Sequence, residues 1–309
     1  MPSPSRILRI IRNVVLIVAA MVAAFFLLVV PWFFTSIITT RQYHYPDLND
    51  GKTPRSYNLD FRWVEFTSPD GVPLKGWYIP AEGAARGTII YCHGLNRTRI
   101  EMLPDAVFGH TLGYNGLLFD FRHQGRSGGA ITTLGYQERW DALGAVRCAV
   151  EQQQAARPVV VWGVSMGASA ALMAAAESPD ISAVISDSSF DSFLGTLRHH
   201  LRLFLHLPGF PIADEVGYWT AWRGHFRPAA FDLVKATERM GDRPILFVAV
   251  EGDRRMPPSI AQNLYAHAQS PLKKIIVLPG HRHGEAFNQA REPYEKAVTD
   301  FLASLPTGK

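Results

Sequence analysis

Cysteine and charge are both scarce in this chain. Its two cysteines, Cys92 and Cys148, provide no disulfide framework in 309 residues. Both are expected to be buried small hydrophobes, and the sequence leaves a bridge between them open. Charged residues make up 19% of the chain, below the share of about 25% that is usual in soluble proteins. This deficit favours an apolar anchor or a lipid-facing surface.

The motifs of several binding functions are also missing. No G-x-G-x-x-G or phosphate-loop pattern occurs, so a nucleotide cofactor has no support. Zinc-finger spacing and basic runs interleaved with aromatics are absent, and the net charge is only +4, which argues against nucleic-acid binding. The histidine pairs His199–His200 and His281-x-His283 lack the accompanying ligand spacing of a metal site. We therefore expect no cofactor and no metal.

A long apolar run occupies the N-terminus. Seventeen apolar residues, Val14 to Val30, continue into an aromatic segment that ends at Phe34, which gives the length of about 20 residues that a membrane span needs. Residues 1–40 are therefore expected to be a single-pass anchor, with a cleaved signal peptide as the alternative. A cytoplasmic N-terminus and a translocated catalytic domain are predicted by the positive charge before the run, which comes from Arg6, Arg9 and Arg12.

The rest of the chain is organised as a linker and one domain. Residues 41–60 are polar and rich in turn formers, which indicates a linker, and residues 61–305 are expected to form the domain. Two strand-like segments flank the turn Ser68–Gly71, which predicts a hairpin. The later apolar runs alternate with helix-compatible stretches, which indicates a mostly parallel sheet covered on both faces. These runs are 88–92, 116–121, 159–162, 181–185, 245–250 and 274–278.

One interval between expected strands is unusually long. About residues 190–235 are predicted to form a lid insertion, and residues 192–211 within it mix apolar and basic side chains. Such a segment can cover a pocket or lie on a membrane surface. A surface helix packed on the sheet has the same periodicity, so all three interpretations stay open.

Ser165 stands between two glycines where a buried strand is expected to become a helix. The pattern Gly163-Val164-Ser165-Met166-Gly167 follows the strand-like VVVW and precedes a run of small residues. A nucleophilic serine needs a base and must project from the backbone, which a sharp strand-to-helix turn achieves. The glycines remove Cβ atoms that would clash in that turn. At the start of the helix, the backbone N–H of Met166 can stabilise an oxyanion.

In this context the chain resembles the α/β-hydrolase superfamily from about residue 60 to residue 305. YCHGL (91–95) looks like the family's His-Gly loop, in which His93 and Gly94 shape the loop and the N–H of Leu95 completes the oxyanion hole. FDFRHQGRSGG (119–129) is similar to the family's D-x-R-G-x-G-x-S segment, with His123 in place of the first glycine. The resemblance implies the family's eight-stranded, mostly parallel sheet with helices on both faces and a small lid.

The same resemblance implies an acid and a base after the serine, in that order. EGDRRMPP (251–258) resembles the family's acid loop and assigns the acid to Asp253, although Gly252 lies directly beside it. LPGHRHGEAF (278–287) resembles the final loop and assigns the base to His283. His281 is the nearest competitor for the base. Alternative acids are Asp187 and Asp191, because some members place the acid after the preceding strand.

These residues predict a serine hydrolase. Ser165 would form an acyl-enzyme, with His283 as base and Asp253 as the orienting acid. The expected substrate is a small-molecule or lipid-like carboxylic ester or thioester, because such leaving groups need less help than an amine. A peptidase or amidase of the same fold is the alternative within enzymes, and a non-catalytic binding protein is the alternative outside them. No oligomeric state is predicted.

Overall fold

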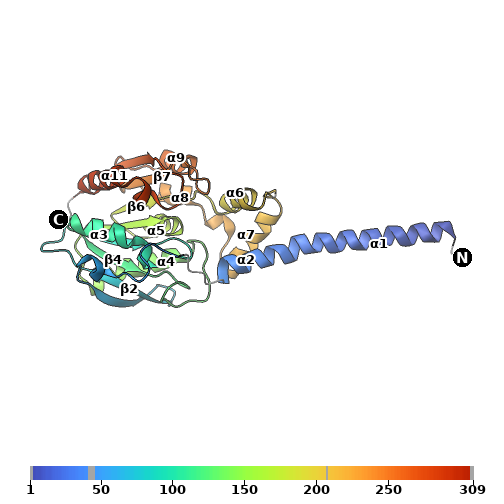
Figure 1. Cartoon of the computed structure of the whole chain (residues 1–309), viewed down its shortest axis with the longest axis horizontal. Coiled ribbons are helices and arrows are strands. Elements are labelled where there is room, and N and C mark those ends of the chain that lie inside the picture. The colour runs from blue at the N-terminus through green and yellow to red at the C-terminus, as the bar shows by residue number, and fades with distance from the viewer. Residues whose placement is uncertain (1–2, 41–45, 207, 307–309) are drawn as a thin grey trace.

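An eight-stranded sheet forms the centre of the molecule (Figure 1). The computed structural model describes residues 3–40, 46–206 and 208–306. The strands, in chain order, are β1 (Arg62–Thr67), β2 (Pro73–Ile79), β3 (Thr88–Cys92), β4 (Asn115–Phe119), β5 (Val159–Val164), β6 (Ala183–Asp187), β7 (Ile245–Val250) and β8 (Lys273–Leu278). Their spatial order is β1-β2-β4-β3-β5-β6-β7-β8.

The pairing follows the prediction of a mostly parallel sheet. β1 and β2 form the expected antiparallel hairpin, and β2 also pairs antiparallel with β4. All later neighbours pair in parallel. Every residue of β3, β4, β5, β6 and β7 is buried, because helices cover both faces of a parallel sheet. The predicted α/β-hydrolase fold is therefore confirmed.

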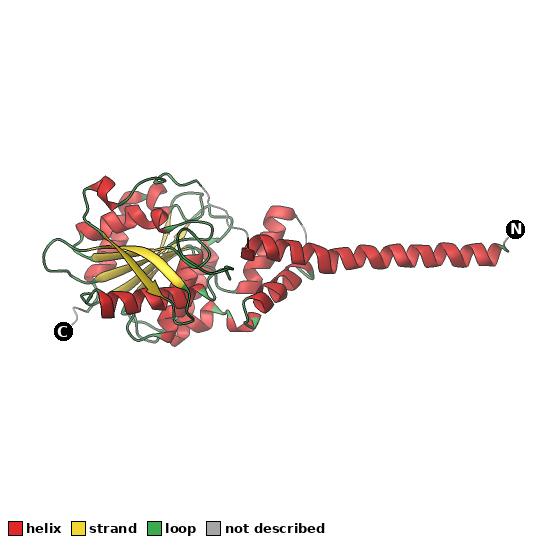
Figure 2. Ribbon diagram, turned by 90° about the horizontal axis from the view of Figure 1, so that it is seen from below, coloured by secondary structure: helices red, strands yellow, loops and turns green. Residues whose placement is uncertain are grey.

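Helices cover both faces of the sheet (Figure 2), and a hydrophobic cluster lies on each face beneath them. One lies under α4 (Glu138–Arg147), α5 (Met166–Glu177), α8 (Leu233–Arg239) and α9 (Pro258–His267). The other lies under α3 (Leu103–Thr111), α10 (Ala286–Gln289) and α11 (Arg291–Ala303). Short helical turns outside these helices include η2 (Pro54–Tyr57), η3 (Arg99–Met102) and η4 (Cys148–Gln152).

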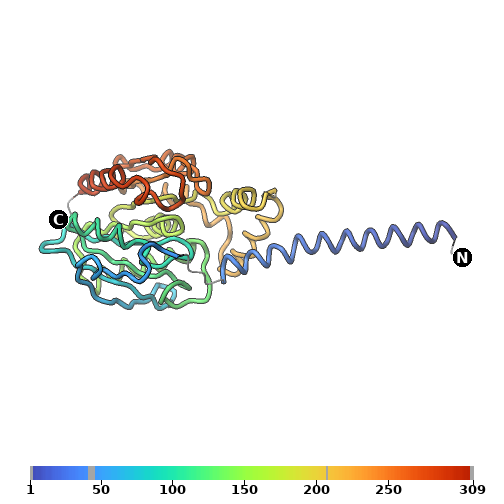
Figure 3. Tube along the Cα trace, viewed as in Figure 1, coloured from blue at the N-terminus to red at the C-terminus, as the bar shows by residue number. Residues whose placement is uncertain are grey.

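The N-terminal helix runs from Pro4 to Thr40 and projects away from the domain (Figure 3). It consists of α1 (Pro4–Ala24), the π-helical turn η1 (Phe25–Val29) and α2 (Val30–Thr40). No residue of α1 is buried, and the helix is long and apolar enough to cross a membrane. At 1.5 Å per residue it measures about 55 Å, which exceeds the hydrocarbon thickness of a bilayer.

The insertion after β6 forms a helical pair that we call the cap, α6 (Phe193–Leu205) and α7 (Ile212–Arg223), followed by η5 (Pro228–Ala230). In Figure 1 the cap lies between the sheet and the projecting helix. α6 packs against α7, and α7 packs against α2. Of the predicted arrangements for this segment, the structure shows a mixed one: α6 packs along α7, while Phe193 at its start is buried in the core cluster on the sheet.

Polar contacts fasten the end of α2 to the domain. Arg223 of α7 donates hydrogen bonds to the hydroxyls of Ser36 and Thr39, at 3.0 and 3.1 Å. The Thr132 N–H donates to the carbonyl of Thr39 at 2.9 Å. The Nε2 atom of His123 hydrogen-bonds the carbonyl oxygen of Thr40 at 3.1 Å. The His123 φ of +60° lies in the left-handed region that glycine adopts most easily, which explains why the related motif has glycine at this position.

The expected linker, residues 41–60, is not a free tether where the structure describes it. Residues 41–45 lie outside the described part of the chain. The 3-10 helix η2 follows, and Tyr57 and Leu59 pack against the cluster under α3 and α11. The apolar side chains of these two residues draw the segment onto the domain surface.

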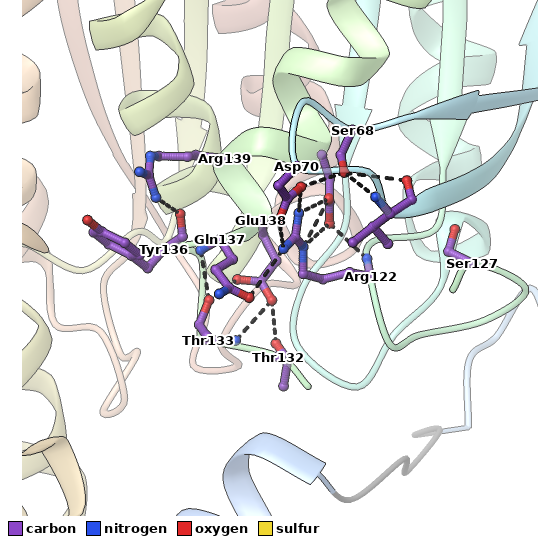
Figure 4. Close-up of polar contacts among 12 residues, drawn as sticks. Ser68, Asp70, Arg122, Ser127, Thr132, Thr133, Tyr136, Gln137, Glu138 and Arg139 are labelled. Atoms are coloured by element: carbon purple, nitrogen blue, oxygen red, sulfur yellow. Dashed lines mark hydrogen bonds and ion pairs between the residues drawn. The ribbon is translucent and has the colours of Figure 1, made fainter. Parts of the chain in front are cut away.

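The buried side chain of Arg122 joins three segments of the domain (Figure 4). The guanidinium of Arg122 donates to Asp141 of α4 at 2.7 Å and to both carboxylate oxygens of Asp70 in the hairpin turn, at 2.7 and 2.8 Å. The adjacent Glu138 accepts hydrogen bonds from the hydroxyls of Thr132 and Thr133. These contacts hold the loop after β4 in place next to the end of α2.

Candidate active site

Ser165 occupies the sharp turn between β5 and α5. Its φ of +54° lies in a region that residues with a Cβ rarely adopt, and its N–H donates to the carbonyl of Asp187 at 2.8 Å. A Cβ on Gly163 would collide with the backbone of Gly167, and one on Gly167 would collide with the carbonyl of Cys92. Both glycines are therefore required by close backbone contact, as the sequence predicts.

A line of hydrogen bonds joins Ser165, His283 and Asp253. His283 Nε2 lies 2.7 Å from the Ser165 hydroxyl oxygen, and its Nδ1 lies 2.7 Å from a carboxylate oxygen of Asp253. Because the carboxylate accepts from Nδ1–H, Nε2 is free to accept the serine proton. The other oxygen of Asp253 accepts the backbone N–H groups of Arg255 and Met256. The acid and the ring are thus fixed in one orientation.

The competing acids and the competing base are engaged elsewhere. Asp187 accepts hydrogen bonds from the hydroxyls of Ser188 and Tyr294, at 2.8 and 3.1 Å. Asp191 accepts from the side-chain amide of Asn263 at 2.9 Å. The ring of His281 is exposed, and its backbone N–H donates to Gln289. Within the described residues, none of these side chains hydrogen-bonds Ser165 or His283, so the structure groups Asp253 and His283 with Ser165.

The protonation of His283 suits a base. Burial lowers the pKa of His283 below its ordinary value of 6.5, and the positive charge of Arg255 lowers it further. Hydrogen bonding to Asp253 opposes these effects without reversing them. Burial alone would raise the pKa of Asp253, but the hydrogen bonds from His283 and the backbone keep that pKa below the usual value. A neutral imidazole next to an ionised carboxylate follows near neutral pH.

The loop after β3 is anchored by two buried side chains. The N–H of Phe121 donates to His93 Nε2 at 3.0 Å, so the opposite nitrogen donates to the carbonyl of Gly94 at 2.7 Å. Burial lowers the pKa of His93 to about 4, which keeps the ring neutral. On the other side, the Gly94 N–H donates to Glu101 at 2.6 Å. Sequence reasoning missed Glu101, since no motif marks a carboxylate seven residues after the glycine.

Ser165 opens into an apolar cavity of about 300 Å³, a size at the lower end of small-molecule sites. The predicted oxyanion residues Leu95 and Met166 both line it beside Ser165. The far walls come from the cap and, unexpectedly, from Phe34 and Ile38 of the N-terminal helix. Sequence reasoning missed this contribution, because an apolar run carries no signal for which of its residues will face a pocket.

The two cysteines and the pair His199–His200 lie in surroundings that indicate structural roles. Cys92 and Cys148 are both free and buried, which closes the possibility of a bridge between them. His199 and His200 bond the backbone carbonyls of Arg254 and Arg255, at 2.7 and 3.2 Å. Within the described ranges, no three His, Cys, Asp or Glu side chains are grouped closely enough to hold a metal ion.

A family model described as the alpha/beta hydrolase fold matches residues 87–205. Among solved structures, the Pyrococcus furiosus esterase Pf2001 is 25% identical with a TM-score of 0.70, covering 87% of this chain and 100% of the esterase. Both similarities support a hydrolase of this fold. The residues that the family model matches include Ser165, whereas Asp253 and His283 lie after the matched range.

Two curated relatives match most of the chain. The uncharacterized protein YqkD of Bacillus subtilis is 28% identical over 76% of this chain and 77% of its own length. The uncharacterized membrane protein YNL320W of Saccharomyces cerevisiae is 22% identical over 87% of this chain and 92% of its own. The name of the yeast relative agrees with an N-terminal helix that is suited to a membrane.

Proposed function

Because the chain belongs to the α/β-hydrolase superfamily, we propose that it is a membrane-anchored serine hydrolase that cleaves a carboxylic ester or thioester. The observation that carries the proposal is the pair of 2.7 Å contacts from Ser165 through His283 to Asp253. The geometry is that of a nucleophile, its base and the group that orients the base. In the proposed topology the N-terminus is cytoplasmic and the catalytic domain lies on the translocated side.

The first half of the reaction forms an acyl-enzyme. His283 Nε2 takes the hydroxyl proton as the Ser165 oxygen bonds to the substrate carbonyl carbon. The carbonyl oxygen becomes an oxyanion, which the backbone N–H groups of Met166 and Leu95 would stabilise. Asp253 stabilises the imidazolium. The intermediate collapses, and the alkoxide or thiolate leaves with the proton from His283.

In the second half of the reaction, water attacks the acyl-enzyme and the Ser165 oxygen becomes the leaving group. His283 takes a proton from the water as its oxygen attacks the acyl carbon, and the Ser165 oxygen then leaves with that proton. The products are a carboxylic acid and an alcohol or thiol, with one water consumed. An ester or thioester suits this site better than an amide, because its leaving group needs less protonation.

The proposal is tested by labelling the protein with a fluorophosphonate and measuring the mass of the intact chain. We expect one adduct on Ser165 in the wild-type protein and none in Ser165→Ala or His283→Ala, because phosphonylation needs an activated hydroxyl. His281→Ala is the matched control and should label like the wild type. A folded wild-type protein that takes no label would instead favour the non-catalytic binding protein.

The pH dependence of kcat/KM offers a second prediction. The base must be neutral, so activity should fall as the pH drops through the pKa of His283 in the free enzyme. Since burial and Arg255 lower that pKa, the midpoint of the acid limb should lie below 6.5. Arg255→Gln removes a positive charge and should move the midpoint upward. A downward shift in Arg255→Gln, or a wild-type midpoint above 6.5, would contradict the effects of burial and Arg255 on the pKa of His283.

A further inference from the structure

The wall of the cavity next to Ser165 is built partly from the helix that is suited to cross a membrane. Phe34 and Ile38 of α2 line the cavity, with Leu197 and Leu201 of α6 among the other lining residues. The same side chains form a small hydrophobic cluster with α7, in which Leu201 is buried and Phe34, Ile38 and Leu197 are partly buried. The cavity therefore continues directly from the Ser165 hydroxyl to the membrane helix.

The position of the last charged residue before the apolar run indicates how deep in the membrane this cavity wall lies. Arg12 is the last charged side chain before the apolar run. Counting the hydrocarbon from the residue after Arg12, about 20 helical residues at 1.5 Å each span its thickness and end near Trp32. Beyond that end, Phe34 and Ile38 lie about 3 Å and about 9 Å further along the helix, and the interfacial layer adds about 5–7 Å on each side. The cavity wall therefore begins inside the headgroup layer, next to the acyl chains, and extends to its outer edge.

The cap presents a surface that fits the same layer. Phe210 is 74% exposed and Trp222 is 69% exposed, and Tyr218 also faces solvent. Arg202 is exposed on α6. Exposed aromatic rings beside basic groups are characteristic of surfaces that lie in an anionic lipid interface. The cap lies next to the projecting helix in Figure 1, so both would meet the same bilayer surface.

The mouth of the cavity is apolar as well. Phe204 and Leu205, the last two residues of α6, line the cavity and are nevertheless 57% and 40% exposed. Exposing an apolar rim to water costs free energy, and this cost is removed when lipid covers the rim. Four polar side chains line the cavity, Ser165, Thr196, His200 and Arg255, and the other fourteen lining residues are apolar. Burial lowers the pKa of His200 to about 4, which keeps it neutral. Such a lining suits an uncharged aliphatic chain.

We propose that the substrate is a long-chain acyl ester held in the same bilayer as the N-terminal helix, and that its acyl chain enters the cavity between α2 and the cap. The inference rests on the proposed function of Ser165 and names its substrate class. Hydrolysis consumes one water and returns a fatty acid and the lipid alcohol to the membrane surface. The membrane helix then has two roles, because it anchors the protein and forms part of the acyl-chain site.

The test uses the full-length protein reconstituted in vesicles of phosphatidylcholine and phosphatidylglycerol. Two probes are compared, 4-methylumbelliferyl oleate dissolved in those vesicles and 4-methylumbelliferyl acetate in the surrounding water. Ile38→Trp narrows the cavity from the helix side and Leu197→Trp narrows it from the cap side. Ile37→Trp is the matched control, since Ile37 is adjacent to Ile38 in the chain but does not line the cavity.

We expect the ratio of kcat/KM for oleate to kcat/KM for acetate to fall about tenfold or more in Ile38→Trp and Leu197→Trp. In Ile37→Trp the ratio should stay within about twofold of the wild type. An unchanged ratio in both cavity variants would overturn the acyl-lipid inference, as would a wild-type enzyme that cleaves acetate but not oleate. If neither probe is cleaved and the fluorophosphonate leaves Ser165 unlabelled, the proposed hydrolase function itself fails.

Discussion

Asp253→Asn is expected to lower kcat for a soluble ester about 10⁴-fold while leaving the fold intact. An amide accepts and donates hydrogen bonds where the carboxylate only accepts, so the ring of His283 can turn its protonated nitrogen toward Ser165. A protonated Nε2 cannot take the serine proton. The expected change is in kcat rather than in KM, because Asp253 is buried behind the ring and is not among the residues that line the cavity.

Asp187→Asn provides the matched control for this prediction. Asp187 lies at the end of the neighbouring strand β6 and hydrogen-bonds Ser188 and Tyr294 rather than His283. Burial raises its pKa to about 6, so an uncharged amide of the same shape should fit with little loss. We expect kcat within about threefold of the wild type. A large loss in Asp187→Asn with an active Asp253→Asn would reassign the orienting acid to β6.

The sharp turn that carries Ser165 and the strands were predictable because short-range patterns determine them. Gly163 and Gly167 occupy positions where a Cβ would strike backbone, and that steric requirement leaves a signature in five residues. The unusual place of Gly252, directly before Asp253, is explained in the same way. A Cβ there would meet the carbonyl of Gly280, so the glycine lets the acid loop approach the loop that carries His283.

The contacts that the sequence did not reveal join segments far apart in the chain. Glu101 contacts the His-Gly loop only because η3 folds back beside it. Phe34 and Ile38 reach the cavity only because α2 packs against α7, about 180 residues later. Apolar side chains are equally compatible with facing lipid or facing protein. Their partner is therefore set by tertiary packing, which the periodicity of one helix does not encode.

The largest expected effect on stability comes from Arg122. Its side chain is 3% exposed and pairs with Asp141, which is fully buried, and with Asp70. Arg122→Ala leaves the Asp141 carboxylate buried without its counter-charge, which should lower the free energy of unfolding by about 3–5 kcal/mol. Guanidinium unfolding of the full-length protein in detergent, followed by tryptophan fluorescence, measures this loss. The exposed pair Lys296–Asp300 supplies the control, since Lys296→Ala should cost less than about 1 kcal/mol.

The cause of the lower free energy of unfolding in Arg122→Ala can be identified from its pH dependence. Burial raises the pKa of Asp141 above the unfolded value of 3.8, and Arg122 opposes that shift. Removing Arg122 should therefore raise the pKa further, so that the folded variant binds a proton that the unfolded chain releases. Stability then falls as pH rises above the unfolded pKa, and the difference from wild type should be smaller at low pH than at high pH.

Adding Asp141→Asn to Arg122→Ala should restore part of the lost stability and remove this pH dependence, because no buried charge is left unpaired. A loss that is equal at all pH values and unchanged by Asp141→Asn would mean that Arg122 stabilises the fold by packing rather than by neutralising Asp141.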